Sequence, residues 1–184
     1  MKYFVYMIEM QNETSLETLR QVAALMMNAA RTAPKARGTD HLEIAMLTGE
    51  DRLRLADRLQ EMSVEPGRGF FARDAGNVRQ AGVVVLIGSR YEPLGLNCGW
   101  CGFPTCEAKV GQAPEAPCAF NTHDLGIAVG SAVSVAADLR TDCRVLYSGG
   151  VAALDMNLLP GCRAVLAIPL SATGKNPFFD RKPL

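Results

Sequence analysis

Four of the six cysteines in this 184-residue chain lie in one short segment, with the spacing C-x2-C-x4-C-x11-C. They are Cys98, Cys101, Cys106 and Cys118. Thiolates are soft ligands that hold iron–sulfur clusters and zinc. Glycines beside the cysteines let the backbone turn its amides toward the sulfurs. Four thiolates at this spacing predict a [4Fe-4S] cluster.

Zinc and unligated thiols are the alternatives for this segment. Structural zinc sites usually pair two C-x2-C units, whereas here only Cys98 and Cys101 have that spacing. Cys143 and Cys162 stand apart, each at the edge of an expected strand, and we interpret them as buried small hydrophobic residues. The spacing therefore favours the cluster over zinc and gives the last two cysteines no metal role.

The elements that must position these cysteines follow from the spacing of apolar residues. Residues Thr14 to Glu17 have the composition of a capping box, and apolar residues at helical spacing follow to about Ala30. Further helices are expected over 52–62, after the loop at 66–69 as far as residue 80, over 124–140 and over 151–157. Strands are expected over 42–47, 82–88, 144–147 and 163–170. Because regular strand–helix–strand units are lacking, we expect an α+β fold with an antiparallel or mixed sheet flanked by helices.

Residues 91–118 differ in kind from the rest of the chain. They are rich in Gly, Pro and Cys and have no sustained period, so they can contribute little apolar core. A bound metal centre could hold such a segment together. We expect a single domain over 1–184, with 91–118 as an inserted iron–sulfur lobe.

Composition excludes several classes of function. The chain is 48% hydrophobic and has 19 Lys+Arg against 19 Asp+Glu, which indicates a folded protein without the basic excess that binds nucleic acid or acidic membranes. The apolar stretch before Glu9 is too short for a signal peptide. The run 125–137 is shorter than the ~18 to 20 residues that a bilayer needs. We therefore expect a cytoplasmic protein without a membrane span, whose cysteines stay reduced.

Residues 95–118 resemble the small [4Fe-4S] domains of electron-transport subunits, such as the B protein of the Rnf complex and the corrinoid iron–sulfur protein. Those domains carry a C-x2-C-G-x3-C run followed by a fourth cysteine, and the final spacing is shorter in this chain. The resemblance implies electron transfer through a cluster.

The remaining residues, 23–88 and from 124 onward, resemble the FMN-dependent nitroreductase family. Ala29 to Pro34 read A-A-R-T-A-P, where the family has the helix-ending signature A-A-x-x-A-P-S. Asp124 to Ala128 open a small-residue helix like the one at the dimer interface of the family. The resemblance implies a nitroreductase-like fold, bound FMN and a homodimer.

The same resemblance implies which residues contact FMN. Residues 149–150 resemble the Gly-Gly loop whose backbone approaches the flavin ring, and residues 181–182 stand where the family often places a basic phosphate contact. Nothing before Thr14 supplies the Arg-Arg-Ser-x-Arg segment that grips the phosphate in nitroreductases, so other basic residues would have to do so. The candidate contacts are Lys35, Arg37, Gly38, Thr39, Gly149, Gly150, Arg181 and Lys182. In the alternative interpretation, residues 34–38 form a solvated turn with two incidental charges.

As a whole, the chain is similar to the uncharacterised ferredoxin-domain-containing family of bacteria and archaea, whose motif P-K-A-R-G is present at Pro34 to Gly38. The hypothesis is an iron–sulfur redox protein that moves electrons between FMN and a one-electron partner protein, which leaves open an FMN-dependent oxidoreductase activity. The alternatives are a flavin-free iron–sulfur sensor or docking protein and a zinc-stapled binding module. No catalytic triad or carboxylate pair is evident, and no substrate is indicated.

Overall fold

The computed structural model describes residues 10–179, apart from the side chains of residues 12–14. Its strands form one antiparallel sheet in the order β1-β2-β4-β3. The elements are α1 (Gln11–Thr32), η1 (Ala36–Gly38), β1 (Leu42–Leu47), α2 (Gly49–Met62), α3 (Phe70–Gln80), β2 (Val83–Ser89), α4 (Cys106–Gln112), α5 (Ala119–Asp138), β3 (Asp142–Cys143), α6 (Tyr147–Asp155) and β4 (Ala164–Ser171).

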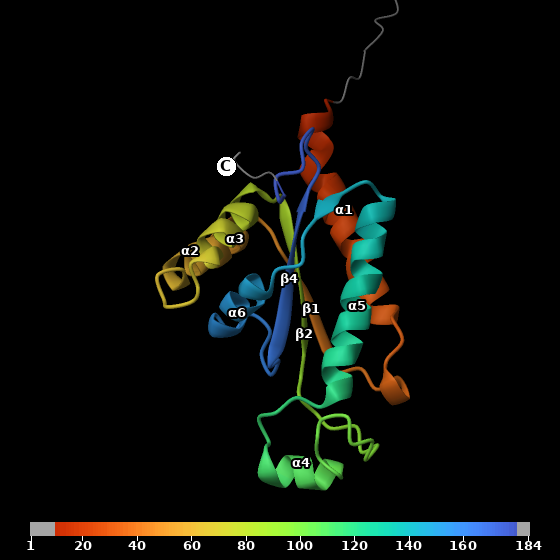
Figure 1. The fold of residues 1–184 in the computed structure, drawn as a ribbon. Helices are drawn as coiled ribbons and strands as arrows, with labels where there is room; N and C mark the ends of the chain where they lie inside the picture. Colours follow the sequence, from red (N-terminus) through yellow and green to blue (C-terminus); the bar gives the residue numbers. More distant parts are fainter. Residues whose placement is uncertain (1–9, 180–184) are drawn as a thin grey trace, which may run out of the picture.

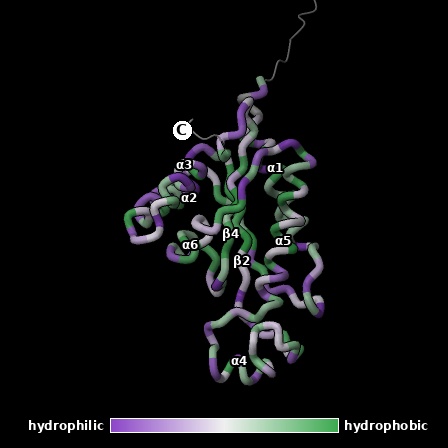
Figure 2. Tube along the Cα trace, viewed as in Figure 1, coloured by the Kyte–Doolittle hydropathy of each residue, from purple (hydrophilic) through white to green (hydrophobic). Residues whose placement is uncertain are grey.

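Helices cover both faces of the sheet, with α1 and α5 on one face and α2, α3 and α6 on the other (Figure 1). Side chains alternate between the faces along a strand, so Val83 and Val85 of β2 pack with α1 and α5, whereas Val84 packs with the other helices. All of β2 is buried, and β2 and β4 form the apolar centre of the molecule (Figure 2). The predicted α+β fold is confirmed, and the sheet is antiparallel rather than mixed.

Helices α1, α2, α5 and α6 all begin earlier than the sequence predicts. Helix α1 begins at Gln11, so Thr14 lies inside the helix and the predicted capping box is wrong; the N-cap residue, Met10, forms no side-chain cap. Helix α5 begins at Ala119, directly after Cys118, rather than at residue 124. This early start brings the fourth cysteine of the motif to the N-terminus of a long helix.

The strand predicted over 144–147 is also wrong. Strand β3 covers only Asp142–Cys143, and Leu146 forms an isolated bridge with Ala167 through two backbone hydrogen bonds of 2.8 and 3.1 Å. The chain then turns directly into α6, which begins at Tyr147. Because α6 packs extensively on β4, tertiary packing overrides the strand propensity of this segment.

The cysteine-rich segment connects β2 to α5 and lies beyond one end of the sheet (Figure 1). It contains the seven-residue helix α4, which the apolar spacing did not predict. No helix within residues 10–179 is both long and apolar enough to cross a membrane.

Candidate functional site

The four cysteines of the motif line a single small cavity at this end of the molecule. Cys98 is exposed, Cys101 and Cys106 are half-buried, and Cys118 is buried. The rest of the wall includes the apolar residues Leu94, Leu96, Phe103 and Phe120 and the polar residues Asn97 and Thr105. Four soft sulfur donors around one cavity fit an iron–sulfur cluster or zinc by their chemistry.

Two glycines shape the loop that carries the first two cysteines. Gly99 follows Cys98 and Gly102 follows Cys101, and both have left-handed backbones, with φ of 74° and 86°. The Gly102 amide donates to the Gly99 carbonyl at 2.9 Å, which closes a tight turn. Because residues with a Cβ adopt this conformation only at a cost, the glycines allow the chain to fold around the cavity.

The other two cysteines are placed by helix starts. Cys106 is the first residue of α4, and its amide donates to the Asn97 side-chain oxygen at 2.8 Å. Thr105 caps the same helix by accepting from the Ala108 amide at 3.0 Å. Cys118 is the N-cap residue of α5. Both cysteines therefore lie where a helix N-terminus carries partial positive charge.

The cysteines outside this segment have different surroundings. Burial raises the pKa of the Cys143 thiol, and nearby Asp142 adds to the effect. Burial likewise raises the pKa of Cys162, with Glu43 as a further cause. A raised thiol pKa keeps the sulfur protonated near neutral pH, which is unfavourable for metal binding. Both cysteines are half-buried rather than buried as predicted, and each packs against one of the two hydrophobic clusters of the core.

No three His, Cys, Asp or Glu side chains of residues 10–179 are arranged to hold a single metal ion, although four sulfurs line the cavity. A single zinc ion with bonds of about 2.3 Å draws its sulfurs close together. A four-iron cluster has its ligands at four corners and spaces them more widely. The chemistry of the four sulfur donors fits either group.

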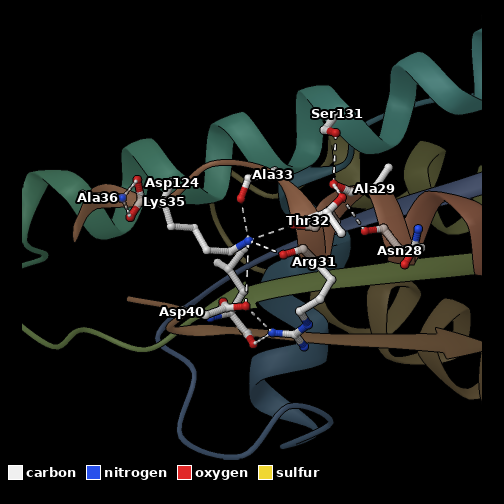
Figure 3. Close-up of polar contacts among 12 residues, drawn as sticks. Asn28, Ala29, Arg31, Thr32, Ala33, Lys35, Ala36, Asp40, Asp124 and Ser131 are labelled. Atoms are coloured by element: carbon white, nitrogen blue, oxygen red, sulfur yellow. Dashed lines mark hydrogen bonds and ion pairs between the residues drawn. The ribbon is translucent and has the colours of Figure 1, made fainter. Parts of the chain in front are cut away.

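Lys35, a predicted phosphate contact, instead lies under the C-terminal end of α1 (Figure 3). Its side chain is 5% exposed, and its ammonium lies 3.8 Å from an oxygen of Asp40. It donates hydrogen bonds to the carbonyls of Ala30, Arg31 and Ala33 at 3.2, 2.6 and 2.8 Å. Helix ends leave such carbonyls unpaired, so Lys35 closes the end of α1 and has no donor to spare for a phosphate in this arrangement.

The next three predicted contacts form the turn η1 and the residue after it. Arg37 and Gly38 have left-handed backbones, with φ of 58° and 65°. Arg37 donates to the Leu94 carbonyl at 2.6 Å and so ties this turn to the wall of the cysteine cavity. Gly38 and Thr39 are exposed. The Ala36 amide donates to both carboxylate oxygens of Asp124, at 3.2 Å each, which fixes the turn against α5 (Figure 3).

Gly149 and Gly150 lie within the first turns of α6, not in a loop before it. A Cβ on Gly150 would come within 1.6 Å of the Val165 carbonyl oxygen, and one on Gly149 within 2.6 Å of the Ala167 Cβ. The glycines therefore allow α6 to press directly against β4. The predicted loop is wrong, because both glycines lie in helix α6. Their small size is explained by the close packing of this helix on β4. Their role in binding a flavin stays a prediction.

The start of α6 is also held from its other side. Ser148 donates to a carboxylate oxygen of Asp74 in α3 at 2.6 Å, and both side chains are buried. Arg73 pairs with the other oxygen of Asp74 at 2.8 Å. This contact was not predicted, since a serine and an aspartate 74 residues apart give no local signal.

An open pocket of about 410 Å³ lies beside α6, within the range usual for small-molecule and cofactor sites. It is lined by residues of the β2–lobe junction, α5, α6 and β4: Tyr91, Thr122, Leu125, Gly126, Tyr147, Val151, Leu154, Arg163, Ala164, Val165 and Leu166. Most of the wall is apolar, with two aromatic rings and one guanidinium. Such a lining suits a flat, anionic aromatic ligand.

The polar groups of this pocket connect it to the cysteine-rich segment. Arg163 forms an ion pair with Glu115, which lies between α4 and α5. Burial raises the pKa of Tyr91, and the charge of Arg163 opposes this shift. The Tyr91 hydroxyl consequently keeps its proton at neutral pH and can act as a hydrogen-bond donor.

The structure does not bring all the predicted flavin contacts together within one chain. The pocket beside α6 is lined by three residues of α5: Thr122, Leu125 and Gly126. A second hollow, lined also by residues 34–36, is formed by other residues of the same helix: His123, Asp124 and Ile127. Positions three and four apart share a face of a helix, so the two sets lie on different faces of α5. The predicted contacts Arg181 and Lys182 lie outside the described residues.

Comparison with known proteins identifies the class of fold. The structure is similar to a nitroreductase with bound FMN from Desulfitobacterium hafniense, with a TM-score of 0.58 at 10% identity, covering 84% of this chain and 78% of that one. It is also similar to a nitroreductase family protein from Clostridium novyi, with a TM-score of 0.57 at 13% identity, covering 88% and 77%. The protein has a nitroreductase-like fold.

Sequence comparison gives the particular family. Residues 115–181 match the model described as "uncharacterized protein containing a ferredoxin domain" (DUF2148). An uncharacterized protein from Archaeoglobus fulgidus is 41% identical over 174 residues, covering 91% of this chain and 94% of its own length. The chain belongs to this ferredoxin-domain family, so the predicted resemblances to this family and to nitroreductases are confirmed. The resemblance of residues 95–118 to the [4Fe-4S] domains of electron-transport subunits stays a prediction.

Proposed function

We propose that this protein is an iron–sulfur flavoprotein that transfers electrons between a hydride donor and a one-electron partner protein. The observation that carries the proposal is the convergence of Cys98, Cys101, Cys106 and Cys118 on one cavity in a chain with a nitroreductase-like fold. FMN exchanges electrons in pairs or singly and a [4Fe-4S] cluster exchanges them singly, so together they connect the two kinds of partner.

In this proposal the four cysteines hold the cluster, and the chain adjusts its surroundings. The helix starts at Cys106 and Cys118 place partial positive charge beside two sulfurs. Phe120 lines the cavity and stacks on Trp100, with ring centroids 5.1 Å apart. Trp100 is 68% exposed, which makes this edge of the lobe accessible to a protein partner.

We place the flavin ring in the pocket beside α6. Its apolar wall excludes water from one face of a ring, and Arg163 and Tyr91 provide a cation and a hydrogen-bond donor at the edge toward the cysteine-rich segment. The close packing of Gly149 and Gly150 brings the first turn of α6 beside this pocket. Residues 34–36 line a hollow on a different face of α5. We infer that this segment contributes to the flavin site of a second copy, in a homodimer.

The flavin assignment predicts that filling the pocket prevents FMN binding. Val151 lines the pocket and is half-buried, so Val151→Trp extends a large ring into the open volume. We expect at least a tenfold loss of FMN affinity, measured by fluorescence titration of the deflavinated protein. The matched control is Val64→Trp, since Val64 is 85% exposed and lies outside the pocket. Equal FMN affinity in the two variants would place the flavin elsewhere.

A flavin-free iron–sulfur protein, which senses redox state or docks to a larger oxidoreductase, is the second candidate. The position of Lys35 favours it, because all three donors of this ammonium are taken by backbone carbonyls of α1 and the following residue. In that case FMN binds neither the wild type nor Val151→Trp. Either function is consistent with reduced cysteines in the cytoplasm.

A further inference from the structure

Lys109 is one of the largest fully buried side chains among the described residues, with 1% of its surface exposed. It lies in the middle of α4, within a small, glycine-rich and proline-rich segment. Its ammonium donates to the Pro114 carbonyl at 3.1 Å. Lysine is almost never fully buried unless its charge is paired, so this position requires a physical reason.

Lys109 takes part in none of the ion pairs found among residues 10–179. The two nearest acids in the sequence are directed elsewhere: Glu107 is exposed, and Glu115 pairs with Arg163. A buried charge without a counter-charge costs several kcal/mol by general estimates. The polypeptide around Lys109 does not supply that counter-charge.

Lys109 lies in the same helix as Cys106, one of the cysteines that line the cavity. Lys109 follows Cys106 by three residues in the same helix, which puts the two on one face with Cβ atoms about 5–6 Å apart. Its hydrogen-bond acceptor, Pro114, precedes Cys118 by four residues. The ammonium thus lies between the helix that carries the third cysteine and the segment that leads to the fourth.

We propose that Lys109 is the internal counter-cation of the metal–sulfur centre and raises its reduction potential. The inference rests on the proposed function, in which four thiolates give the oxidised centre a net negative charge. One-electron reduction adds a further negative charge to the lobe. A buried cation nearby stabilises the reduced form more than the oxidised form, and so favours reduction.

The test is a potentiometric titration of anaerobically purified protein, with dithionite as the electron source and the electron paramagnetic resonance signal of the reduced cluster as the readout. Lys109→Met removes the charge and the hydrogen bond, whereas Lys109→Gln removes the charge but can still donate to the Pro114 carbonyl. We expect a more negative midpoint potential in both variants. Lys109→Arg retains the charge and should remain close to the wild type.

Arg54→Gln controls for net charge, because Arg54 lies in α2 with its side chain 71% exposed. It should leave the potential unchanged. An unchanged potential in iron-loaded Lys109→Gln would overturn the inference.

Iron and sulfide assays on the same samples separate this inference from the proposed function. Wild-type protein without iron and sulfide means that the proposed function fails, whereas loaded variants with unaltered potentials mean that only the role of Lys109 fails. Both neutral variants, Lys109→Met and Lys109→Gln, could lose their iron while Lys109→Arg and Arg54→Gln retain it. That result would mean that the protein needs a positive charge at position 109 to retain its iron, and the inference would stand. Equal loss from Lys109→Arg and Lys109→Gln would contradict it.

Discussion

Replacing Cys101 with serine is expected to remove most of the iron and acid-labile sulfide, together with the brown colour of the cluster. Cys101 lies between Gly99 and Gly102 in the loop that curves around the cavity, and its sulfur is one of the four donors there. A serine hydroxyl is a harder and much less acidic ligand than a thiol, so it binds iron poorly. Iron, sulfide and visible absorbance are measured on anaerobically purified protein.

The control for this prediction is Cys143→Ser. Cys143 is half-buried like Cys101, but it lies in β3, lines none of the cysteine cavity, and has a pKa raised by burial. We expect this variant to keep a full complement of iron and sulfide. A full cluster in Cys101→Ser would remove Cys101 from the ligand set, and loss of zinc rather than iron would favour the zinc-stapled alternative.

Gly150→Ala is expected to destabilise the fold by about 3 kcal/mol or more, the upper part of the range for overpacked cores. The added Cβ would lie 1.6 Å from the Val165 carbonyl oxygen and 2.4 Å from its carbon, and both are backbone atoms that no rotamer change can move. Helix α6 must therefore shift away from β4. The free energy of unfolding, measured in urea on the complete protein, gives the size of the effect.

Gly76→Ala provides the matched control, since Gly76 is also a helical glycine, in α3, but a methyl group added there would meet no atom within 4 Å. There the substitution is expected to stabilise the protein by roughly 0.5–1 kcal/mol, because alanine has the higher helix propensity. Opposite signs in the two variants identify close packing as the reason for Gly150. Similar effects in both would show that helix α6 does not press on β4 as described.

The sequence predicts α1 and β2 well, because apolar residues recur at helical spacing in α1 and run continuously through β2. The β-branched run in β2 is buried along its whole length, and the apolar spacing in α1 matches the residues that pack on the sheet. Local sequence composition predicted secondary structure less well where tertiary contacts determine which element forms. Arg144 to Tyr147 has strand-like composition, but the contact of α6 with β4 starts the helix at Tyr147.

The candidate site is predictable in part, for a similar reason. Cysteine spacing predicts the four residues that line the cavity, since the ligands of such a centre lie close together in the chain. The role of Lys35 could not be predicted from its charge alone, because whether an ammonium faces solvent or the end of α1 depends on the path of the following turn. Lys109 gave no signal, because its burial depends on how the lobe folds.

The central claim is tested most directly by the ultraviolet–visible spectrum of anaerobically purified protein, before and after dithionite, with iron, sulfide, zinc and FMN assayed on the same sample. We predict about four iron and four sulfide per chain, together with bound FMN and bleaching of both chromophores on reduction. Zinc in place of iron, or a colourless protein without iron and sulfide, would contradict the account.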